Sequence, residues 1–278
     1  MMVLNSHAKI NLSLKINSKN KNDLHEIQSF FCLIDLVDKI KIKKIKTKKD
    51  KIIFKGPFAK LVNKSNNSII NLLNLLRDLK LISNHYSVNV KKNIPIFSGL
   101  GGGTGNAASI FKHLIKKKIE KSLLGQIEKK IGSDFRLFFY QQGFLKNLGS
   151  IIKFKKQKMF FVLIQPDVKC STKEIYSRVQ DFSKKHSFNS NKIKTKLKLI
   201  SHLSKSRNEL QSVVEKKYPI VKDLLKDIKK EQGCYFSRMT GSGSVCYGIF
   251  NNRIKARKAL NNLKTKYPKF WSSLAKTV

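Results

Sequence analysis

The 278-residue chain is poor in acidic side chains and in cysteine, proline, glycine and tryptophan. Asp and Glu together number 17, against 58 Lys and Arg, and there are only four cysteines and one tryptophan. Cys32, Cys170, Cys234 and Cys246 form no C-x-x-C pair and no metal-ligand spacing with the six histidines. We therefore expect these cysteines to be reduced thiols that form neither a disulfide framework nor a metal site.

Long apolar runs are also missing. No stretch approaches the roughly 18 consecutive apolar residues that a membrane helix needs. The segment 1–17 lacks the apolar centre of a signal peptide and has the pattern of a mature strand. These absences predict a cytoplasmic protein that does not use a membrane as a partner.

The formal net charge of +41 raises the possibility of a basic, non-catalytic nucleic-acid-binding protein. Its lysines, however, are spread over the whole length, beside many Asn and Ile residues. The sequence has no helix-turn-helix, zinc-finger or ribonucleoprotein motif and no stripe of aromatic and basic residues. We expect solvent-facing lysines and no nucleic acid as the primary partner, although the charge should favour encounter with anionic nucleotides and diphosphates.

The few glycines are concentrated in one place. Residues 98–108, here called the glycine loop, read Ser-Gly-Leu-Gly-Gly-Gly-Thr-Gly-Asn-Ala-Ala and hold five of the 14 glycines. Each glycine costs backbone entropy, so such density indicates a tight turn with a close approach. Apolar residues at helical spacing follow, including Ala107, Leu114 and Ile115. The loop should therefore lead into a helix N-terminus, where N–H groups and the helix dipole favour a phosphate.

Three other interpretations of the loop fit less well. A Walker A loop needs a Gly-Lys-Ser/Thr ending, which is missing here. A Rossmann fingerprint is met only loosely by 103–108, and the acidic residue at the required distance, Glu128, lies in a predicted amphipathic helix. A flexible linker would not run straight into a helix.

Hydrophobic periodicity predicts an α+β protein. Short alternating runs over 1–55, among them 8–16, 30–34, 39–45 and 51–54, indicate an antiparallel hairpin series. A helix is expected over 67–79, and another should be capped by Ser122 and end at Gly132. A buried strand is expected over 159–164 and a hairpin over 236–250. Further helices are predicted over 172–179, 196–203, 208–217, 220–229 and 253–266.

Further motifs accompany the glycine loop in a fixed order. They are Ala-Lys-Ile-Asn-Leu at 8–12, Asn-Asp-Leu-His at 22–25, Gly-Ser-Asp at 132–134, Ser-Thr at 171–172, Asn-Glu-Leu at 208–210 and Thr-Gly-Ser-Gly at 240–243. Together they span nearly the whole chain. In this order the sequence resembles the GHMP kinase superfamily.

The resemblance implies a fold and a reaction. The fold is the GHMP kinase fold, with a ribosomal-protein-S5-like N-terminal domain over 1–155, a C-terminal α+β domain over 156–278 and an active site in the cleft between them. The reaction is ATP-dependent phosphorylation, with Mg²⁺, of a hydroxyl on a cytidyl diphosphate sugar alcohol of non-mevalonate isoprenoid synthesis. A mevalonate- or homoserine-type kinase is the alternative. We expect a monomer or weak homodimer.

The resemblance also assigns roles to single residues. Lys9 and Asp134 match the catalytic lysine and base, although by local sequence alone Lys9 is a solvent-face lysine and Asp134 a helix N-cap. Thr104 is the candidate for Mg²⁺. Residues implied in ATP binding are Pro95, Ser98, Gly99, Leu100, Gly101, Gly102, Gly103, Thr104, Gly105 and Asn106. Residues implied in substrate binding are Asn11, His25, Tyr176, Thr240, Gly241, Ser242 and Gly243.

Some positions depart from the family pattern. Leu24 stands where an aromatic residue should pack on the cytosine, so Tyr176 would carry most of the stacking. Phe97 stands where a small residue is expected, and Gly105 removes one hydroxyl, which leaves Thr104 to serve alone. Arg136 and Leu137 replace a proline and an aliphatic residue after the predicted base.

Overall fold

The computed structural model of the chain describes residues 2–19, 25–116, 120–185, 187–189 and 193–278. Contacts divide the chain into two units, each assembled from separate stretches. Unit 1 comprises 1–9, 36–96 and 101–140, and unit 2 comprises 10–35, 97–100 and 141–278. The division into domains 1–155 and 156–278 stays a prediction, as does a cleft between them.

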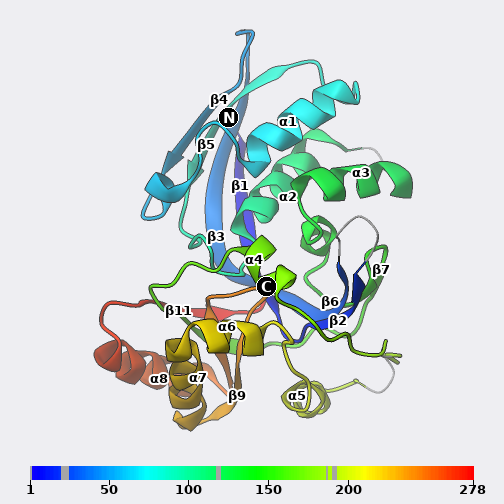
Figure 1. Cartoon of the computed structure of the whole chain (residues 1–278). Coiled ribbons are helices and arrows are strands. Elements are labelled where there is room, and N and C mark those ends of the chain that lie inside the picture. Colours follow the sequence, from blue (N-terminus) through cyan, green and yellow to red (C-terminus); the bar gives the residue numbers. More distant parts are fainter. Residues whose placement is uncertain (1, 20–24, 117–119, 186, 190–192) are drawn as a thin grey trace. The chain divides into compact units, whose positions relative to one another are not determined.

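The elements are numbered in chain order, and Figure 1 labels most of them. The strands are β1 (Met2–Asn11), β2 (Lys15–Lys19), β3 (His25–Ile45), β4 (Lys51–Lys55), β5 (His85–Lys91), β6 (Gln142–Asn147), β7 (Ser150–Ile152), β8 (Phe160–Gln165), β9 (Cys234–Met239), β10 (Cys246–Phe250) and β11 (Trp271–Lys276). The α-helices are α1 (Ser68–Asp78), α2 (Gly102–Leu114), α3 (Lys121–Ile131), α4 (Thr172–Ser177), α5 (Lys196–Ser204), α6 (Gln211–Lys217), α7 (Pro219–Lys230) and α8 (Arg253–Lys266). Two 3₁₀ helices are η1 (Ala59–Leu61) and η2 (Phe135–Phe139).

The sheet of unit 1 contains β5 between the second part of β3 and β4. β3 pairs with β5 in antiparallel register, whereas β4 runs parallel to β5. Along β3, Ile40 and Ile42 are buried while Lys39, Lys41 and Lys43 are exposed. This two-residue alternation places one face of the sheet in the core and leaves a lysine-rich face in solvent.

Helix α1 shows why the sequence signals are reliable at this position. The Asn67 side chain caps it by accepting hydrogen bonds from the N–H groups of Ile69 and Ile70. The cap satisfies two of the four N–H groups that a helix start leaves without partners. Its apolar residues recur at helical spacing on the buried face, and they are Ile69, Leu72, Leu73 and Leu76.

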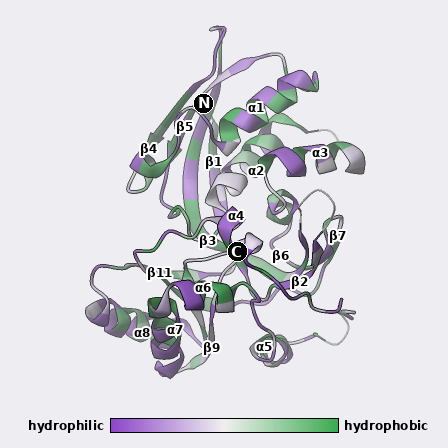
Figure 2. Cartoon of the chain, viewed as in Figure 1, coloured by the Kyte–Doolittle hydropathy of each residue, from purple (hydrophilic) through white to green (hydrophobic). Residues whose placement is uncertain are grey.

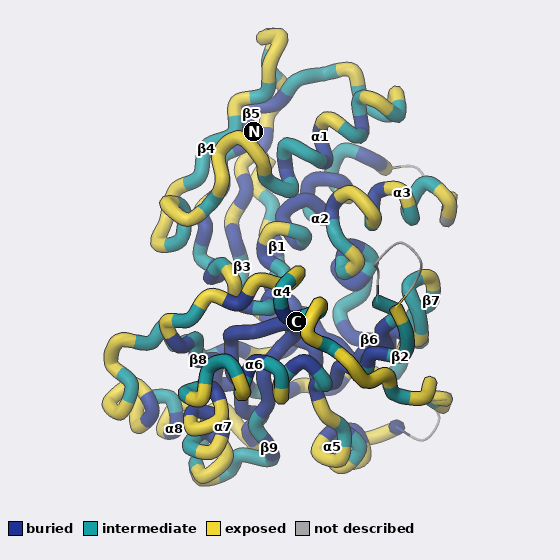
Figure 3. The backbone as a smooth tube through the Cα atoms, viewed as in Figure 1, coloured by how far each residue is buried: buried dark blue, intermediate teal, exposed yellow. Residues whose placement is uncertain are grey.

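Among the described residues of unit 2, a four-stranded antiparallel sheet has the order β11-β8-β10-β9. β10 is buried along its whole length, and the tube is dark blue through much of this sheet in Figure 3. Helices α7 and α8 pack on the sheet and carry both hydrophobic and hydrophilic colours in Figure 2. The buried residues of α7 are Val221, Leu224, Leu225 and Ile228.

The predicted α+β class is confirmed, and the helices lie close to their predicted positions. The antiparallel hairpin series is wrong in two respects. The runs 30–34 and 39–45 belong to the single strand β3, and β4 pairs in parallel with the distant β5. Ser122 does not cap α3, because the N-cap residue is Glu120, whereas Gly132 ends that helix as predicted.

Candidate active site

The predicted catalytic pair forms within unit 1. The ammonium Nζ of Lys9, on β1, lies 2.8 Å from Oδ2 of Asp134. The Lys9 side chain is only 3% exposed, so it is not the solvent-face lysine that local sequence favours, and the Asp134 side chain is 26% exposed. The pair therefore combines a buried cation with a carboxylate that solvent or a substrate can reach.

Asp134 is positioned by a tight turn between α3 and η2. Gly132 ends α3 with a φ of 141°, in the positive region where a Cβ is disfavoured, and its C=O accepts from the N–H of Phe135 at 3.0 Å. Asp134 stands at the N-cap of η2, but its side chain makes no capping hydrogen bond. The local interpretation of Asp134 as a plain helix cap is therefore wrong, because its carboxylate is engaged by Lys9.

The glycine loop begins α2. Gly101 is the N-cap residue in the left-handed conformation, with a φ of 68°, and no side chain caps the helix. Within the described residues, the N–H groups of Gly102, Gly103 and Thr104 have no hydrogen-bond partner. An uncapped helix start with adjacent N–H donors is suited to phosphate oxygens, so this part of the chain fits a nucleotide.

The glycines of the loop leave room for protein groups as well. A Cβ on Gly101 would lie 3.0 Å from Cζ of Phe138 and 3.2 Å from Cε of Lys9. A Cβ on Gly105 would lie 2.8 Å from Cε1 of Phe138. The glycine at 101 therefore allows the Lys9 stem to pass beneath the loop, which links the loop to the catalytic pair.

Thr104, the candidate for Mg²⁺, lies beside the same turn. Its Oγ1 is 3.2 Å from the position that a Cβ on Gly132 would take. In the described part of the chain, no cluster of three or more His, Cys, Asp or Glu side chains could hold a metal ion. A role for Thr104 toward Mg²⁺ stays a prediction.

Within unit 2, Asn11 contacts the loop 240–243. The N–H of Asn11 donates to Oγ1 of Thr240 at 2.9 Å, and its Nδ2 donates to Oγ of Ser29 at 2.8 Å. Gly241 has a φ of 54°, and a Cβ there would lie 3.2 Å from Oδ1 of Asn11. Asn208 holds this loop by donating to the C=O of Gly241 at 2.8 Å.

The first part of the glycine loop, 98–100, also belongs to unit 2. Gly99 approaches the backbone of Thr240 so closely that a Cβ would lie 2.0 Å from its carbonyl oxygen. Oγ of Ser98 accepts from the N–H of Leu100 at 3.2 Å. Phe97 adopts a φ of 55°, a conformation that favours glycine, and so the unexpected residue at 97 carries backbone strain.

The predicted nucleobase residues meet in unit 2. The ring centroids of His25 and Tyr176 are 5.0 Å apart, and Phe182 lies 6.3 Å from His25. Phe182 is 46% exposed, which is unusual for such a large apolar ring. No motif in the sequence pointed to Phe182, although it follows Tyr176 closely in the chain. Leu24 lies outside the described residues.

The remaining predicted site residues contact other parts of the protein. Pro95 and Leu100 are buried. Oγ of Ser242 lies 3.0 Å from Oγ1 of Thr172, at the start of α4. Gly243 faces Met239, whose sulfur would lie 2.8 Å from a Cβ. Asn106 is buried and donates from Nδ2 to Asp38 at 3.0 Å, which the sequence analysis did not foresee.

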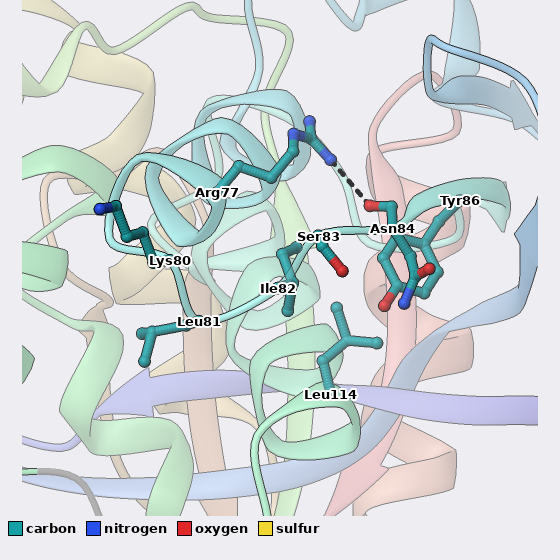
Figure 4. Close-up of a pocket in the computed structure, with 8 residues that line it drawn as sticks. All are labelled: Arg77, Lys80, Leu81, Ile82, Ser83, Asn84, Tyr86 and Leu114. Carbon is teal, nitrogen blue, oxygen red and sulfur yellow. Dashed lines mark hydrogen bonds between the residues drawn. The ribbon is translucent and has the colours of Figure 1, made fainter.

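A surface pocket in unit 1 has a volume of about 620 Å³. Figure 4 shows it at the end of α1, where Arg77 donates a hydrogen bond to the C=O of Asn84. Its lining residues are Arg77, Lys80, Leu81, Ile82, Ser83, Asn84, Tyr86 and Leu114, and they include no predicted site residue. The pocket is thus separate from the loop and the catalytic pair.

The cysteines are free thiols, as predicted. Burial raises the pKa of Cys170 to about 11 and that of Cys234 to about 12. Within the described residues, no helix has the length and hydropathy needed to cross a membrane.

Comparison with known proteins decides the family. The GHMP kinases C terminal family matches residues 185–269. The chain is 38% identical to the 4-diphosphocytidyl-2-C-methyl-D-erythritol kinase of Pelagibacter ubique, and the alignment covers 99% of this chain and 98% of that protein. The chain belongs to this kinase family. A relative from Caldanaerobacter subterraneus with the same name is 30% identical, with 99% and 96% of the two chains covered.

Solved structures agree on the fold. A crystal structure of 4-(cytidine 5'-diphospho)-2C-methyl-D-erythritol kinase superposes with a TM-score of 0.74 at 20% identity and covers 99% of each chain. A homoserine kinase from Cytophaga hutchinsonii gives a TM-score of 0.61 at 15% identity, covering 100% of this chain and 94% of that one. The resemblance to GHMP kinases and the expected GHMP kinase fold are confirmed.

Proposed function

We propose that Lys9 and Asp134 catalyse transfer of the γ-phosphoryl group of ATP to the 2-hydroxyl of 4-diphosphocytidyl-2-C-methyl-D-erythritol, a step of non-mevalonate isoprenoid synthesis. The observation that carries this proposal is the ion pair of 2.8 Å between a buried lysine and an accessible carboxylate, beside an uncapped helix start. Phosphoryl transfer needs held phosphates and an aligned acceptor hydroxyl, and these groups would provide both.

Asp134 acts as the general base. It takes the proton of the acceptor hydroxyl while that oxygen bonds to phosphorus and ADP leaves. Lys9 orients the carboxylate through their 2.8 Å contact, and its charge stabilises the negative charge that develops on the acceptor oxygen. Bound ATP would supply the phosphoryl group and would carry Mg²⁺ on its phosphates, and Thr104 is the residue of this chain that we propose toward the metal.

The N–H groups of Gly102, Gly103 and Thr104 would hold phosphate oxygens, aided by the dipole of α2. His25 and Tyr176 would hold the cytosine ring, while Asn11 and the loop 240–243 would hold the rest of the substrate. We further propose that the enzyme works in the cytoplasm as a monomer or weak homodimer, without nucleic acid as a primary partner.

A coupled assay of ADP release tests the proposal. Purified protein should turn over ATP with the cytidyl substrate, and it should show at least tenfold lower kcat/KM with mevalonate or homoserine. Turnover of mevalonate or homoserine in preference to the cytidyl compound would refute the substrate assignment. A protein that releases no ADP with any of the three would refute the kinase mechanism itself.

A further inference from the structure

A buried ion pair in unit 1 is not used by the proposed mechanism. Nζ of Lys92 lies 2.7 Å from Oδ2 of Asp38, the Asp38 side chain is 0% exposed and that of Lys92 is 5% exposed. Removing two charges from water costs several kcal/mol per ion, so a buried pair is weak evidence for stability by itself. A different physical reason is needed for placing charges here.

Asp38 ties together three separate segments of the chain. Its Oδ2 accepts from Nζ of Lys92 at 2.7 Å and from Nδ2 of Asn106 at 3.0 Å. Its Oδ1 accepts from the N–H groups of Asn93 at 2.7 Å and Ile94 at 2.8 Å. A carboxylate has about four acceptor positions, and here all of them are used. Asp38 on β3 thus fixes both the connection that enters the glycine loop and helix α2 that leaves it.

Lys92 contacts both the segment before the glycine loop and the start of α2. Its Nζ also donates to the C=O of Ile94 at 2.7 Å. The same Nζ lies 2.8 Å from the position that a Cβ on Gly102 would take. Because Gly102 is the first residue of α2, the ammonium group lies directly against the helix start whose N–H groups would bind phosphate.

The side-chain amide of Asn106 is held in one orientation by this hydrogen-bond network. Asn106 belongs to the glycine loop, it is 2% exposed, and its Oδ1 has no hydrogen-bond partner among the described residues. A buried acceptor without a hydrogen-bond partner is destabilising. The donation from Nδ2 to Asp38 therefore sets the orientation of this amide.

We propose that Asp38 and Lys92 are positioning residues for nucleotide binding, and that they hold the first turn of α2 and the segment 92–94 in the geometry that receives phosphates. The inference rests on the proposed ATP-dependent function. The pair acts through backbone position and does not touch the nucleotide. A hydrogen bond to a charged group is strong enough that losing one weakens binding by about 10- to 100-fold, so the predicted effect is on ATP affinity.

The test uses the double variant Asp38→Asn/Lys92→Met, which removes both charges together and leaves no isolated buried ion. Asn at 38 can still accept from the N–H groups of Asn93 and Ile94. Its amide nitrogen, in the place of Oδ2, would face the Nδ2 donor of Asn106 and would donate to that residue only after the Asn106 amide turns to present Oδ1. Calorimetry should show ATP binding weakened by about 10- to 100-fold, with the KM of the alcohol substrate changed less than about threefold.

A matched control is the pair Asp50–Arg77, also in unit 1, with an N–O distance of 2.6 Å and lower burial. Asp50→Asn/Arg77→Met should lower the Tm and leave the Kd for ATP unchanged. Equal losses of ATP affinity in both variants would overturn the proposal, because they would reflect general destabilisation. A folded Asp38→Asn/Lys92→Met protein with a Kd for ATP within twofold of the wild type would also overturn it.

If the double variant does not fold, Gly102→Ala is compared with Gly103→Ala. A methyl group at 102 would press on the Lys92 ammonium at 2.8 Å and on Ile94 at 3.0 Å, whereas one at 103 would meet only Oγ of Ser68 at 3.2 Å. A loss of ATP affinity at least fivefold greater for Gly102→Ala supports the proposal, and equal Kd values for the two variants overturn it. Because calorimetry needs no turnover, these outcomes are separate from the choice of alcohol substrate. Should the wild type bind ATP without phosphorylating the cytidyl compound, the proposed reaction fails while this comparison still gives an answer.

Discussion

Replacing Asp134 by Asn tests the proposed base most directly. Asn keeps the shape and retains an oxygen that can accept from Lys9, but it cannot take a proton from the acceptor hydroxyl. A positioned general base contributes about 10²- to 10⁴-fold, which corresponds to about 3–5 kcal/mol of transition-state stabilisation. We expect kcat to fall by that factor, with ATP affinity changed little, since the phosphates would be held by α2 and not by Asp134.

The structure also predicts a stability effect that must be measured alongside. Lys9 is 3% exposed and loses its counter-ion in this variant. Breaking a fully buried pair costs about 3–5 kcal/mol, and the 26% exposure of Asp134 should keep the loss below that range. Rates should therefore be compared with the Tm and with ATP binding by calorimetry, at a temperature where both proteins are folded.

Two further variants separate catalysis from stability. If Lys9 and Asp134 act as a unit, Asp134→Asn/Lys9→Met should lose about as much kcat as the more severe single variant. Asp50→Asn removes a carboxylate that is paired elsewhere in unit 1 and should leave kcat within twofold. A folded Asp134→Asn protein with kcat within about threefold of the wild type would refute the assignment of the base.

Three other predictions follow from the same geometry. Gly101→Val forces a β-branched side chain into a φ of 68° and against the Lys9 stem. In a folded protein kcat should therefore fall at least tenfold. An unchanged kcat would show that the glycine loop does not influence the Lys9–Asp134 pair. Tyr176→Ala should raise the KM of the cytidyl substrate about 5- to 100-fold, because a stacking contact worth roughly 1–3 kcal/mol is lost, and the KM of ATP should stay unchanged. A rise in the KM of ATP instead would show that the cytosine does not bind at Tyr176. Native protein at pH 8 should react slowly with a thiol reagent. Burial raises the pKa of Cys170 to about 11 and that of Cys234 to about 12, so both thiols stay protonated below those values. A rapid reaction of either cysteine in the folded protein would contradict its burial.

Local signals in the sequence were sufficient for much of the fold. Helix α1 was predictable because Asn67 caps it and its apolar residues repeat at helical spacing. The end of α3 was predictable because Gly132 takes a positive φ that other residues avoid. In both cases the decisive interaction lies within a few residues, where a sequence pattern records it directly.

Features that depend on distant partners were not predictable in the same way. The continuity of β3 was missed because its apolar run is interrupted by Asp35 and Asp38, which look like the end of a strand. Asp38 can stay in the strand because Lys92 and two N–H groups beyond β5 satisfy it. The parallel pairing of β4 with β5 likewise depends on a register that no local pattern specifies.

The role of the loop glycines follows from combining the two buried pairs. Gly101 leaves room for the stem of Lys9, and Gly102 leaves room for the ammonium of Lys92. Each lysine is neutralised by its own carboxylate, Asp134 or Asp38. These pairs therefore add little net charge beneath the first turn of α2, and attraction for a phosphate there comes mainly from oriented N–H groups. The large positive charge of the surface would then act on the rate of encounter with anionic substrates, while the glycines and buried pairs determine the geometry of binding.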